Sequence, residues 1–225
     1  MSTIVSFENR VELPLNIGSL AEFRMWTQTP HFPETGRIDF LGDRIEVDMS
    51  PENLYCHGTL KTEISSVLHQ LARKQSLGDV FVDSTRVCCP GANLSVEPDV
   101  VVVSYDSLET GRVKLVPNAT EAADQFVELE GPPDLIVEIV SDSSVAKDVR
   151  RLPPVYFAAG VNEFWLADAR GEKLEFQVYV RGDSAFVLQA ADSSGAQFSP
   201  TFNCRFRLER SRNRVGNWIF DLSWQ

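Results

Sequence analysis

Apolar positions along the chain change their spacing several times, and each spacing predicts a different element. From Ser19 to Thr29 the apolar residues recur every three to four positions, which predicts a short helix that Ser19 caps and Pro30 ends. The same helical spacing returns over a longer stretch, from Asn53 to about Gln75. The first third of the chain is therefore expected to hold one short helix and one long packing helix.

Between and after these helices the pattern is typical of strands. Arg37 to Leu41 and Arg44 to Met49 flank Gly42-Asp43, as in a tight hairpin. Beyond Gly78 come several extended apolar runs, namely DVFVD, TRVCC, PDVVVV, PPDLIVEIV and NEFWLAD. A short helix over Pro154 to Ala159, and a further hairpin that turns at Gly182-Asp183, complete the list.

Together these elements predict an α/β (α+β) fold in which a mixed β-sheet is flanked by helices. We expect an N-terminal helical extension before this sheet and β-hairpins at the C-terminal end. With 225 residues, 43% hydrophobic and 24% charged, the chain resembles an ordinary globular domain. No run approaches the ~18 apolar residues that a membrane helix needs, so we expect a cytoplasmic protein without a membrane partner.

Charge and cysteine spacing narrow the classes of function. A net charge of −11 argues against a protein that coats nucleic acid by bulk attraction, so an anionic partner must be bound locally. Basic residues cluster at 147–151 and again at 205–214, and such runs are usually solvated faces. The four cysteines lack CxxC spacing, which predicts reduced core thiols rather than a metal site.

Two carboxylates interrupt otherwise apolar strands. Glu138 lies within the run Leu135 to Val140, and Asp99 stands at the head of the run Val100 to Val103. A buried, ionised carboxylate must be protonated, paired or bound to a cation, because leaving it unpaired costs several kcal/mol. If the two strands are neighbours, a divalent ion such as Mg²⁺ between these acids is one answer. The other is that Glu138 pairs with an Arg or Lys and Asp99 caps its strand.

At this point the sequence resembles a known family. The segments MSPENLYCHGTL, EPDVVVV, PPDLIVEIVSDSS and KDVRRLPPVYFAAGVNEFWLAD, in this order, are similar to the Uma2 (DUF820) group of restriction-type endonucleases in the PD-(D/E)XK superfamily. The resemblance extends from about Arg37 to about Val180. It implies an N-terminal extension over residues 1–35 and an endonuclease domain over 36–225, with core motifs in 37–180 and C-terminal strands in 181–225.

The resemblance also implies a restriction-endonuclease-like sheet whose acids hold Mg²⁺ or Mn²⁺ for hydrolysis of DNA. By their positions in the motifs, Asp99 corresponds to the motif aspartate and Glu138 to the second acid, both as metal ligands. His57 corresponds to a histidine at the start of the long helix. Glu63 is a further metal-ligand candidate, without a matching motif position. Nucleases that cut both strands commonly pair, so a homodimer is expected.

The basic residue of the superfamily pattern is missing from its usual places. Two positions after the second acid, where the superfamily pattern has its basic residue, stands Val140. Many Uma2-like sequences instead have a lysine on the following helix, and that position here holds Leu152. Lys147 is the preferred substitute over Arg150 and Arg151, because a lysine can tune its pKa whereas arginine stays charged. The alternative interpretation, that these three residues are solvated or only hold phosphate, stays open.

Two functions of different classes therefore follow from the sequence. The first is a metal-dependent endonuclease with Asp99, Glu138, Lys147 and His57 in its active site. The second is a catalytically inactive descendant that keeps the fold as a binding or regulatory module. The chain has no GxSxG, Walker A, GxGxxG or HExxH motif, so serine hydrolase, nucleotide-binding and zincin functions lack their key residues.

Overall fold

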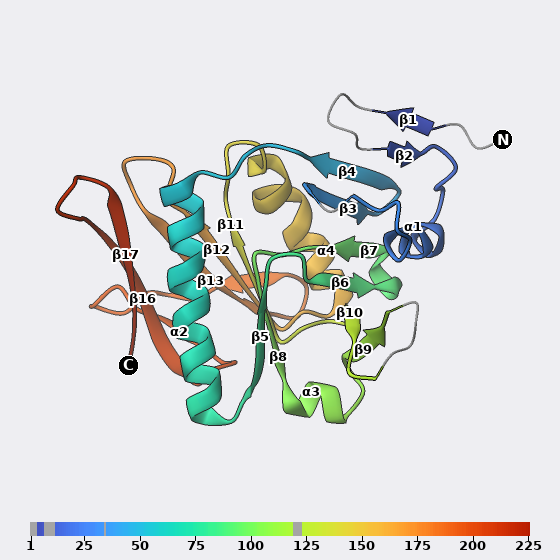
Figure 1. Ribbon diagram of the computed structural model, residues 1–225. Helices are drawn as coiled ribbons and strands as arrows, with labels where there is room; N and C mark the ends of the chain where they lie inside the picture. Colours follow the sequence, from blue (N-terminus) through green and yellow to red (C-terminus); the bar gives the residue numbers. More distant parts are fainter. Residues whose placement is uncertain (1–3, 7–11, 34, 119–122) are drawn as a thin grey trace.

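The computed structural model describes residues 4–6, 12–33, 35–118 and 123–225 of the chain. Residues 1–3, 7–11 and 34 of the expected N-terminal extension lie outside the described part, as do residues 119–122. Within the described part the structure is a mixed α+β fold with helices beside several sheets (Figure 1).

Two six-stranded sheets form the body of the molecule. The first sheet has the order β4-β3-β7-β6-β10-β9, and the central sheet has the order β14-β13-β12-β11-β8-β5. Strands of the first sheet are β3 (Arg37–Leu41), β4 (Arg44–Asp48), β6 (Arg86–Cys89), β7 (Leu94–Val96), β9 (Lys114–Pro117) and β10 (Phe126–Glu130). Strands of the central sheet are β5 (Gly78–Val82), β8 (Val100–Ser104), β11 (Leu135–Ile139), β12 (Glu163–Asp168), β13 (Glu175–Arg181) and β14 (Phe186–Leu188).

Smaller elements surround these two sheets. A hairpin of β1 (Ile4–Ser6) and β2 (Glu12–Pro14) lies at the N-terminal end, and β15 (Gln197–Ser199), β16 (Cys204–Arg212) and β17 (Trp218–Trp224) form a C-terminal sheet. The helices are α1 (Leu20–Thr27), α2 (Leu60–Gln75), α3 (Tyr105–Glu109) and α4 (Leu152–Ala159). Two π-helical turns, Leu54–Thr59 and Lys147–Arg151, run directly into α2 and α4, and a 3₁₀ turn spans Pro90–Ala92.

The fold class predicted from the sequence is confirmed, but its strands form several sheets where one was expected. The two large sheets pack against each other. Val87 and Leu94 of the first sheet lie in one buried cluster with Val101 and Ile136 of the central sheet. The two sheets therefore share one hydrophobic layer, which α4 joins through Leu152 and Tyr156.

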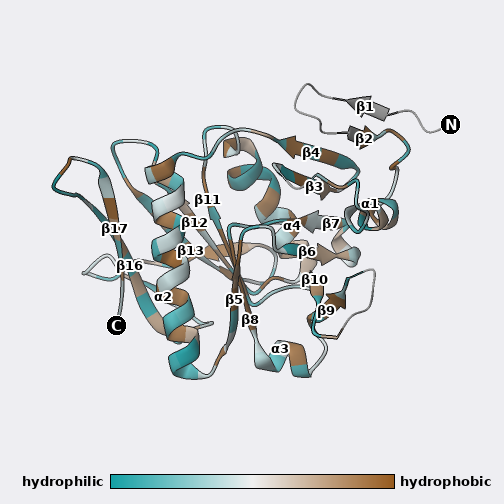
Figure 2. Ribbon diagram, in the orientation of Figure 1, coloured by the Kyte–Doolittle hydropathy of each residue, from teal (hydrophilic) through white to brown (hydrophobic). Residues whose placement is uncertain are grey.

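The other face of the central sheet is covered by α2 and by the C-terminal sheet. Leu60, Ile64 and Leu68 of α2 are fully buried and pack against Val137 and Trp165 of the central sheet, as the helical spacing of the sequence predicts. Figure 2 shows hydrophilic and hydrophobic bands alternating along this helix. The long packing helix is thus the element that closes this second core.

The alternation of side chains in β11 decides which layer each residue enters. Leu135, Val137 and Ile139 belong to the core under α2, whereas Ile136 and Val140 belong to the core between the sheets. Glu138 shares the second face, because successive strand residues point to opposite sides. A carboxylate is thereby placed in the layer between the two large sheets.

Several local predictions are confirmed. The side chain of Ser19 accepts a hydrogen bond from Glu22 N at the start of α1, and the hairpin β3–β4 turns at Gly42 with a φ of 70°. The four cysteines are free thiols, of which Cys88 and Cys89 are buried. Within the described ranges, no helix has the length and apolar character needed to cross a membrane.

Candidate active site between the two sheets

Asp99 and Glu138 come together because β8 and β11 are antiparallel neighbours. Their register pairs Val100 with Val137, so one further step places Asp99 opposite Glu138. Asp99 is fully buried, Glu138 is 1% exposed, and Oδ2 of Asp99 accepts a hydrogen bond from Ile139 N at 2.7 Å. The condition under which the sequence would bring these two acids together, that their strands are neighbours, is thus met.

Basic side chains surround the other oxygen of Asp99. The distances to Oδ1 are 2.7 Å from Arg37 Nη2, 3.3 Å from Lys61 Nζ and 3.4 Å from His57 Nε2. Burial by itself would raise the pKa of Asp99, but the hydrogen bond from His57 and the charges of Arg37 and Lys61 hold it well below the usual range. Asp99 is therefore an ionised carboxylate inside the protein.

Glu138 has the opposite environment. Its Oε1 accepts a hydrogen bond from the hydroxyl of Tyr156 at 2.5 Å, and its Oε2 has no hydrogen-bond partner among the residues that the structure describes. Burial first, and then the negative charges of Asp148 and Asp99, raise the pKa of Glu138 well above its usual value. This carboxyl group favours a proton or a cation at its open oxygen.

The π-helical turn before α4 carries two further ionisable groups into the site. Lys147 Nζ contacts Asp39 Oδ2 of β3 at 2.8 Å, and the charge of Glu138 also acts on this lysine. Asp148 is fully buried and accepts a hydrogen bond from Ser144 Oγ, while its Oδ1 has no partner within the described ranges. Burial raises the pKa of Asp148 to about 6.

The prolines that follow this turn do not break α4. Pro153 and Pro154 stand in the first turn of the helix, where the fixed φ of proline is tolerated. The helix begins at Leu152, slightly earlier than predicted, and Gly160 ends it with a φ of 98°, as predicted. Tyr156 thereby lies on the buried side of α4, within reach of Glu138.

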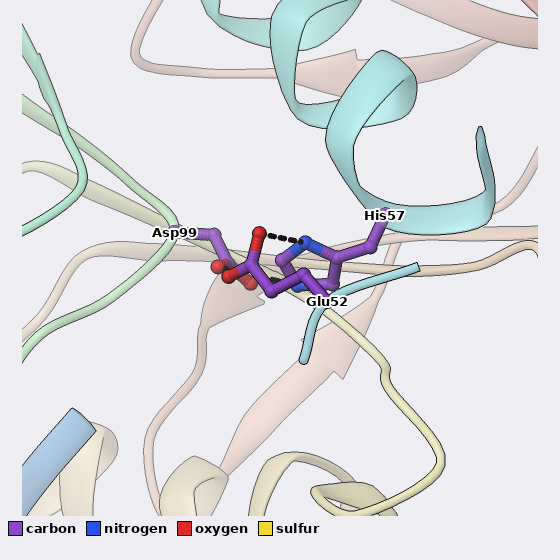
Figure 3. Close-up of side chains that lie close together, drawn as sticks. All are labelled: Glu52, His57 and Asp99. Carbon is purple, nitrogen blue, oxygen red and sulfur yellow. Dashed lines mark ion pairs between the residues drawn. The ribbon is translucent and has the colours of Figure 1, made fainter. Parts of the chain in front are cut away.

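His57 enters the site from the π-helical turn that precedes α2. Asn53 caps this turn, with Oδ1 accepting from Tyr55 N and Cys56 N at 3.0 and 2.9 Å. The imidazole lies between two carboxylates, with Nε2 toward Asp99 and Nδ1 3.1 Å from Glu52 Oε2 (Figure 3). The contact of Nδ1 lacks hydrogen-bond alignment, so Nδ1 counts as a buried nitrogen without a hydrogen-bond partner in the described part of the chain.

Glu52, His57 and Asp99 form a candidate metal site. One donor atom from each of the three residues lies within 4.8 Å of the others. Asp99 belongs both to this group and to the pair with Glu138. Both the group of Glu52, His57 and Asp99 and the pair of Asp99 and Glu138 therefore depend on the position of Asp99.

Two cavities open above these residues. The smaller, about 240 Å³, is lined in part by Arg37, Glu52 and His57, and the larger, about 510 Å³, in part by Arg37, Asp39 and Lys147. Their walls share Arg37, Asp48, Ser50 and Ser143. Asp48 Oδ2 accepts a hydrogen bond from Ser143 Oγ at 2.7 Å, which links β4 to the loop after β11 across the entrance region.

Glu63 is placed elsewhere. Its Oε1 accepts a hydrogen bond from Leu222 N of β17 at 2.9 Å, so its carboxylate is engaged at the C-terminal sheet. Glu63 is not part of the cluster of Glu52, His57 and Asp99.

Sequence reasoning missed Arg37, Asp39, Glu52 and Lys61. Asp39 carried the same signal as Glu138, because it interrupts the apolar run of Ile38, Phe40 and Leu41 and is 2% exposed. Lys61 carried a similar signal, as a charge next to the buried Leu60 of α2. Arg37 begins β3 and interrupts no apolar run, and Glu52 lies in the motif segment MSPENLYCHGTL, where its polar neighbours gave no sign of a buried site.

The comparisons with known proteins agree with this geometry. A family model described as "Uma2: Putative restriction endonuclease" matches residues 20–210 of the chain. The chain belongs to the Uma2 family. The resemblance of the motifs to this family is thus confirmed, and nuclease is the activity that the description of the family names.

A solved structure supports the fold. The crystal structure of a "putative nuclease belonging to DUF820" from Anabaena variabilis is 21% identical, with a TM-score of 0.57, over 82% of this chain and 90% of that chain. At this identity the likeness concerns the Uma2 fold alone. No curated protein matches the chain.

Proposed function

We propose that this Uma2 protein is a divalent-metal-dependent endonuclease that hydrolyses phosphodiester bonds of DNA. The observation that carries the proposal is the pair of Asp99 and Glu138, two buried carboxylates on neighbouring strands of which one keeps an oxygen without a described partner. Family membership supports the same class of reaction. A cation would give the open oxygen of Glu138 a partner. It would also reduce the repulsion from Asp148 and Asp99 that helps to raise the pKa of Glu138.

The donor atoms fit a divalent ion. Asp99 and Glu138 would hold it, and Glu52 and His57 would supply further donors next to Asp99. Carboxylate oxygens suit Mg²⁺ and Mn²⁺, and the imidazole nitrogen favours the transition metal of these two. When bound, the ion would polarise the phosphate, lower the pKa of a coordinated water and stabilise charge on the leaving oxygen.

The remaining groups have roles that follow from their places. Lys147, between Asp39 and Glu138, would place a positive charge at the wall of the larger cavity, where a phosphate would bind. His57 lines the smaller cavity and would position or exchange a proton at its rim. Nucleases that cut both strands of a duplex commonly pair up to do so, so we infer a homodimer, which sedimentation velocity would test.

Nicking of supercoiled plasmid tests the proposal. With Mn²⁺ or Mg²⁺ the native chain should convert supercoiled DNA to open circles, and Asp99→Asn, Glu138→Gln and Lys147→Met should lose this activity. Glu63→Gln is the matched control, because Glu63 is an acid of α2 that is hydrogen-bonded to β17. Loss of activity in Glu63→Gln alone, with Glu138→Gln unimpaired, would contradict the assignment of the site.

A second candidate function is a nuclease-fold binding or regulatory module without catalysis. It is favoured by the internal pairing of the basic groups: Arg37 and Lys61 contact Asp99, and Lys147 contacts Asp39. Such a module would leave plasmid intact, and millimolar Mn²⁺ would not raise its melting temperature. A rise in melting temperature that Asp99→Asn abolishes would support the metal site, and nicking of plasmid would then distinguish an enzyme from a metal-binding module.

A further inference from the structure

Arg37 is the nearest positively charged group to Asp99 among the described residues. It is the first residue of β3, and its Nη2 donates to Asp99 Oδ1 at 2.7 Å. The negative charges of Asp99, Glu138 and Asp39 act on the guanidinium and raise its pKa, although burial lowers it. All three acids therefore lie within electrostatic reach of this one cation.

The hydrogen bonds of Asp99 leave little room for a second cation. Oδ2 is engaged by Ile139 N, and Oδ1 is engaged by Arg37, with His57 and Lys61 slightly farther away. A divalent ion bound to Asp99 and Glu138 would stand within a few ångströms of the guanidinium. The two positive charges would repel each other in this partly buried site, so binding of the ion at Asp99 would compete with the guanidinium.

The Arg37 side chain is mostly buried but reaches the walls of two cavities. It is 20% exposed and lines both the 240 Å³ and the 510 Å³ cavity. Among the described residues, Asp99 is the hydrogen-bond partner of this guanidinium, through Nη2, which leaves its other N–H donors available to a bound group. A guanidinium with free donors matches the paired oxygens of a phosphate, and it stays charged at any physiological pH.

We propose that Arg37 is an exchangeable cation of this site. In the metal-free protein the guanidinium of Arg37 balances the charge of Asp99. When a divalent ion binds, Arg37 leaves Asp99 and its N–H groups donate to a phosphate group in the cavities. This inference rests on the proposed metal-dependent function and specifies which residue the ion displaces. It makes Arg37 the phosphate-binding residue beside Lys147, in a chain that has Val140 and Leu152 where a catalytic lysine is expected.

Binding of Mn²⁺ alone, followed by calorimetric titration in the absence of nucleic acid, tests the exchange. Arg37→Met removes the competing charge, so Mn²⁺ should bind at least about tenfold more tightly than to the native chain. Arg37→Lys keeps a cation and should bind Mn²⁺ nearly as the native chain does. Arg151→Met is the matched control, because Arg151 lines the larger cavity but is paired with Glu46 instead of Asp99.

Stability supplies a second measurement that does not depend on activity. Without metal, Arg37→Met should melt at a lower temperature than the native chain, because Asp99 loses its nearest counter-charge. Saturating Mn²⁺ should narrow or reverse this difference. If Arg37→Met does not fold, Arg37→Gln removes the same charge and keeps polar atoms near Asp99, and the same two results are expected of it.

The outcomes separate this inference from the proposed function. Equal Mn²⁺ affinity in the native chain and in both neutral variants would overturn the exchange and leave the metal-dependent enzyme standing. Binding of Mn²⁺ to none of these proteins would overturn the proposed function, and the exchange with it. Tighter binding in Arg37→Met that Arg151→Met reproduces would show a general field effect and would also overturn the exchange.

Discussion

Tyr156 and Glu138 form the most confined contact of the candidate site. Both residues are buried, and the hydroxyl of Tyr156 is the partner of Glu138 Oε1. The other oxygen of Glu138 has no partner in the described part of the chain. The geometry of this carboxyl group therefore depends on a single hydroxyl, unless a cation binds.

Tyr156→Phe should destabilise the protein by about 1–3 kcal/mol, because it leaves a buried polar group without its hydrogen bond and adds no compensating contact. Urea unfolding measures the change. Tyr105→Phe is the control, since Tyr105 is exposed and the same hydroxyl is lost to solvent. A change equal to that of the control would mean that the hydroxyl of Tyr156 does not support Glu138.

Asp148 predicts a dependence of stability on pH. Burial raises its pKa from 3.8 to about 6 in the folded chain. Between these two values the folded state binds more protons than the unfolded state, so this group makes the fold less stable as pH rises from about 4 to about 6. Above that window the charged, buried carboxylate costs up to roughly 3 kcal/mol.

Asp148→Asn removes this titration and keeps the oxygen that accepts from Ser144. The variant, measured against the native chain by urea unfolding at several pH values, should become more stable relative to the native chain as the pH rises from 4 to 7. A difference that stays constant across this range would show that Asp148 keeps an ordinary pKa in the fold.

At the scale of elements, most of the secondary structure could be predicted from the sequence. The helical spacing of α2, the cap of α1 and the two hairpins at Gly42 and Gly182 depend on residues near one another in the chain. The division of the strands between two large sheets could not be predicted. It depends on pairings such as β6 with β10, which join residues about forty positions apart.

The site followed the same rule. Asp99 and Glu138 were predictable because each interrupts an apolar run, and a buried charge is costly wherever the chain folds. The contact of Arg37 with Asp99 joins residues sixty-two positions apart, and no local pattern indicates it. For Glu63 the sequence suggested a metal ligand, but its position on α2 places its carboxylate against β17, where it accepts a hydrogen bond.

The turn that carries His57 offers a prediction at this scale. Asn53 accepts from two backbone N–H groups there, so Asn53→Ala should cost about 1 kcal/mol of stability, while Asn53→Asp keeps the acceptor and should cost little. The same Asn53→Ala variant should bind Mn²⁺ more weakly, because the turn positions His57 next to Glu52. Calorimetric titration and urea unfolding of both variants decide this. Unchanged stability in Asn53→Ala would show that the cap does not hold the turn.

For the whole molecule, charge sets how nucleic acid can be bound. The net charge of −11 repels a polyanion, and the Arg-rich strand β16 is largely engaged internally: Arg210 donates to backbone carbonyls and Arg207 pairs with Glu209. In the proposed binding of DNA, phosphates would contact the two cavities, where Arg37, Lys147 and Arg151 line the walls. Few counterions should be released on binding.

The salt dependence of duplex binding measures this number. For the inactive Glu138→Gln variant with Ca²⁺, the slope of log K against log salt should be no steeper than about −3, because each phosphate contact contributes about −0.9. Adding Arg37→Met should make the slope shallower by about 1. A slope of about −6 or steeper would mean that DNA is bound along another face, and substitution of Arg205 and Arg212 would then show whether β16 supplies it.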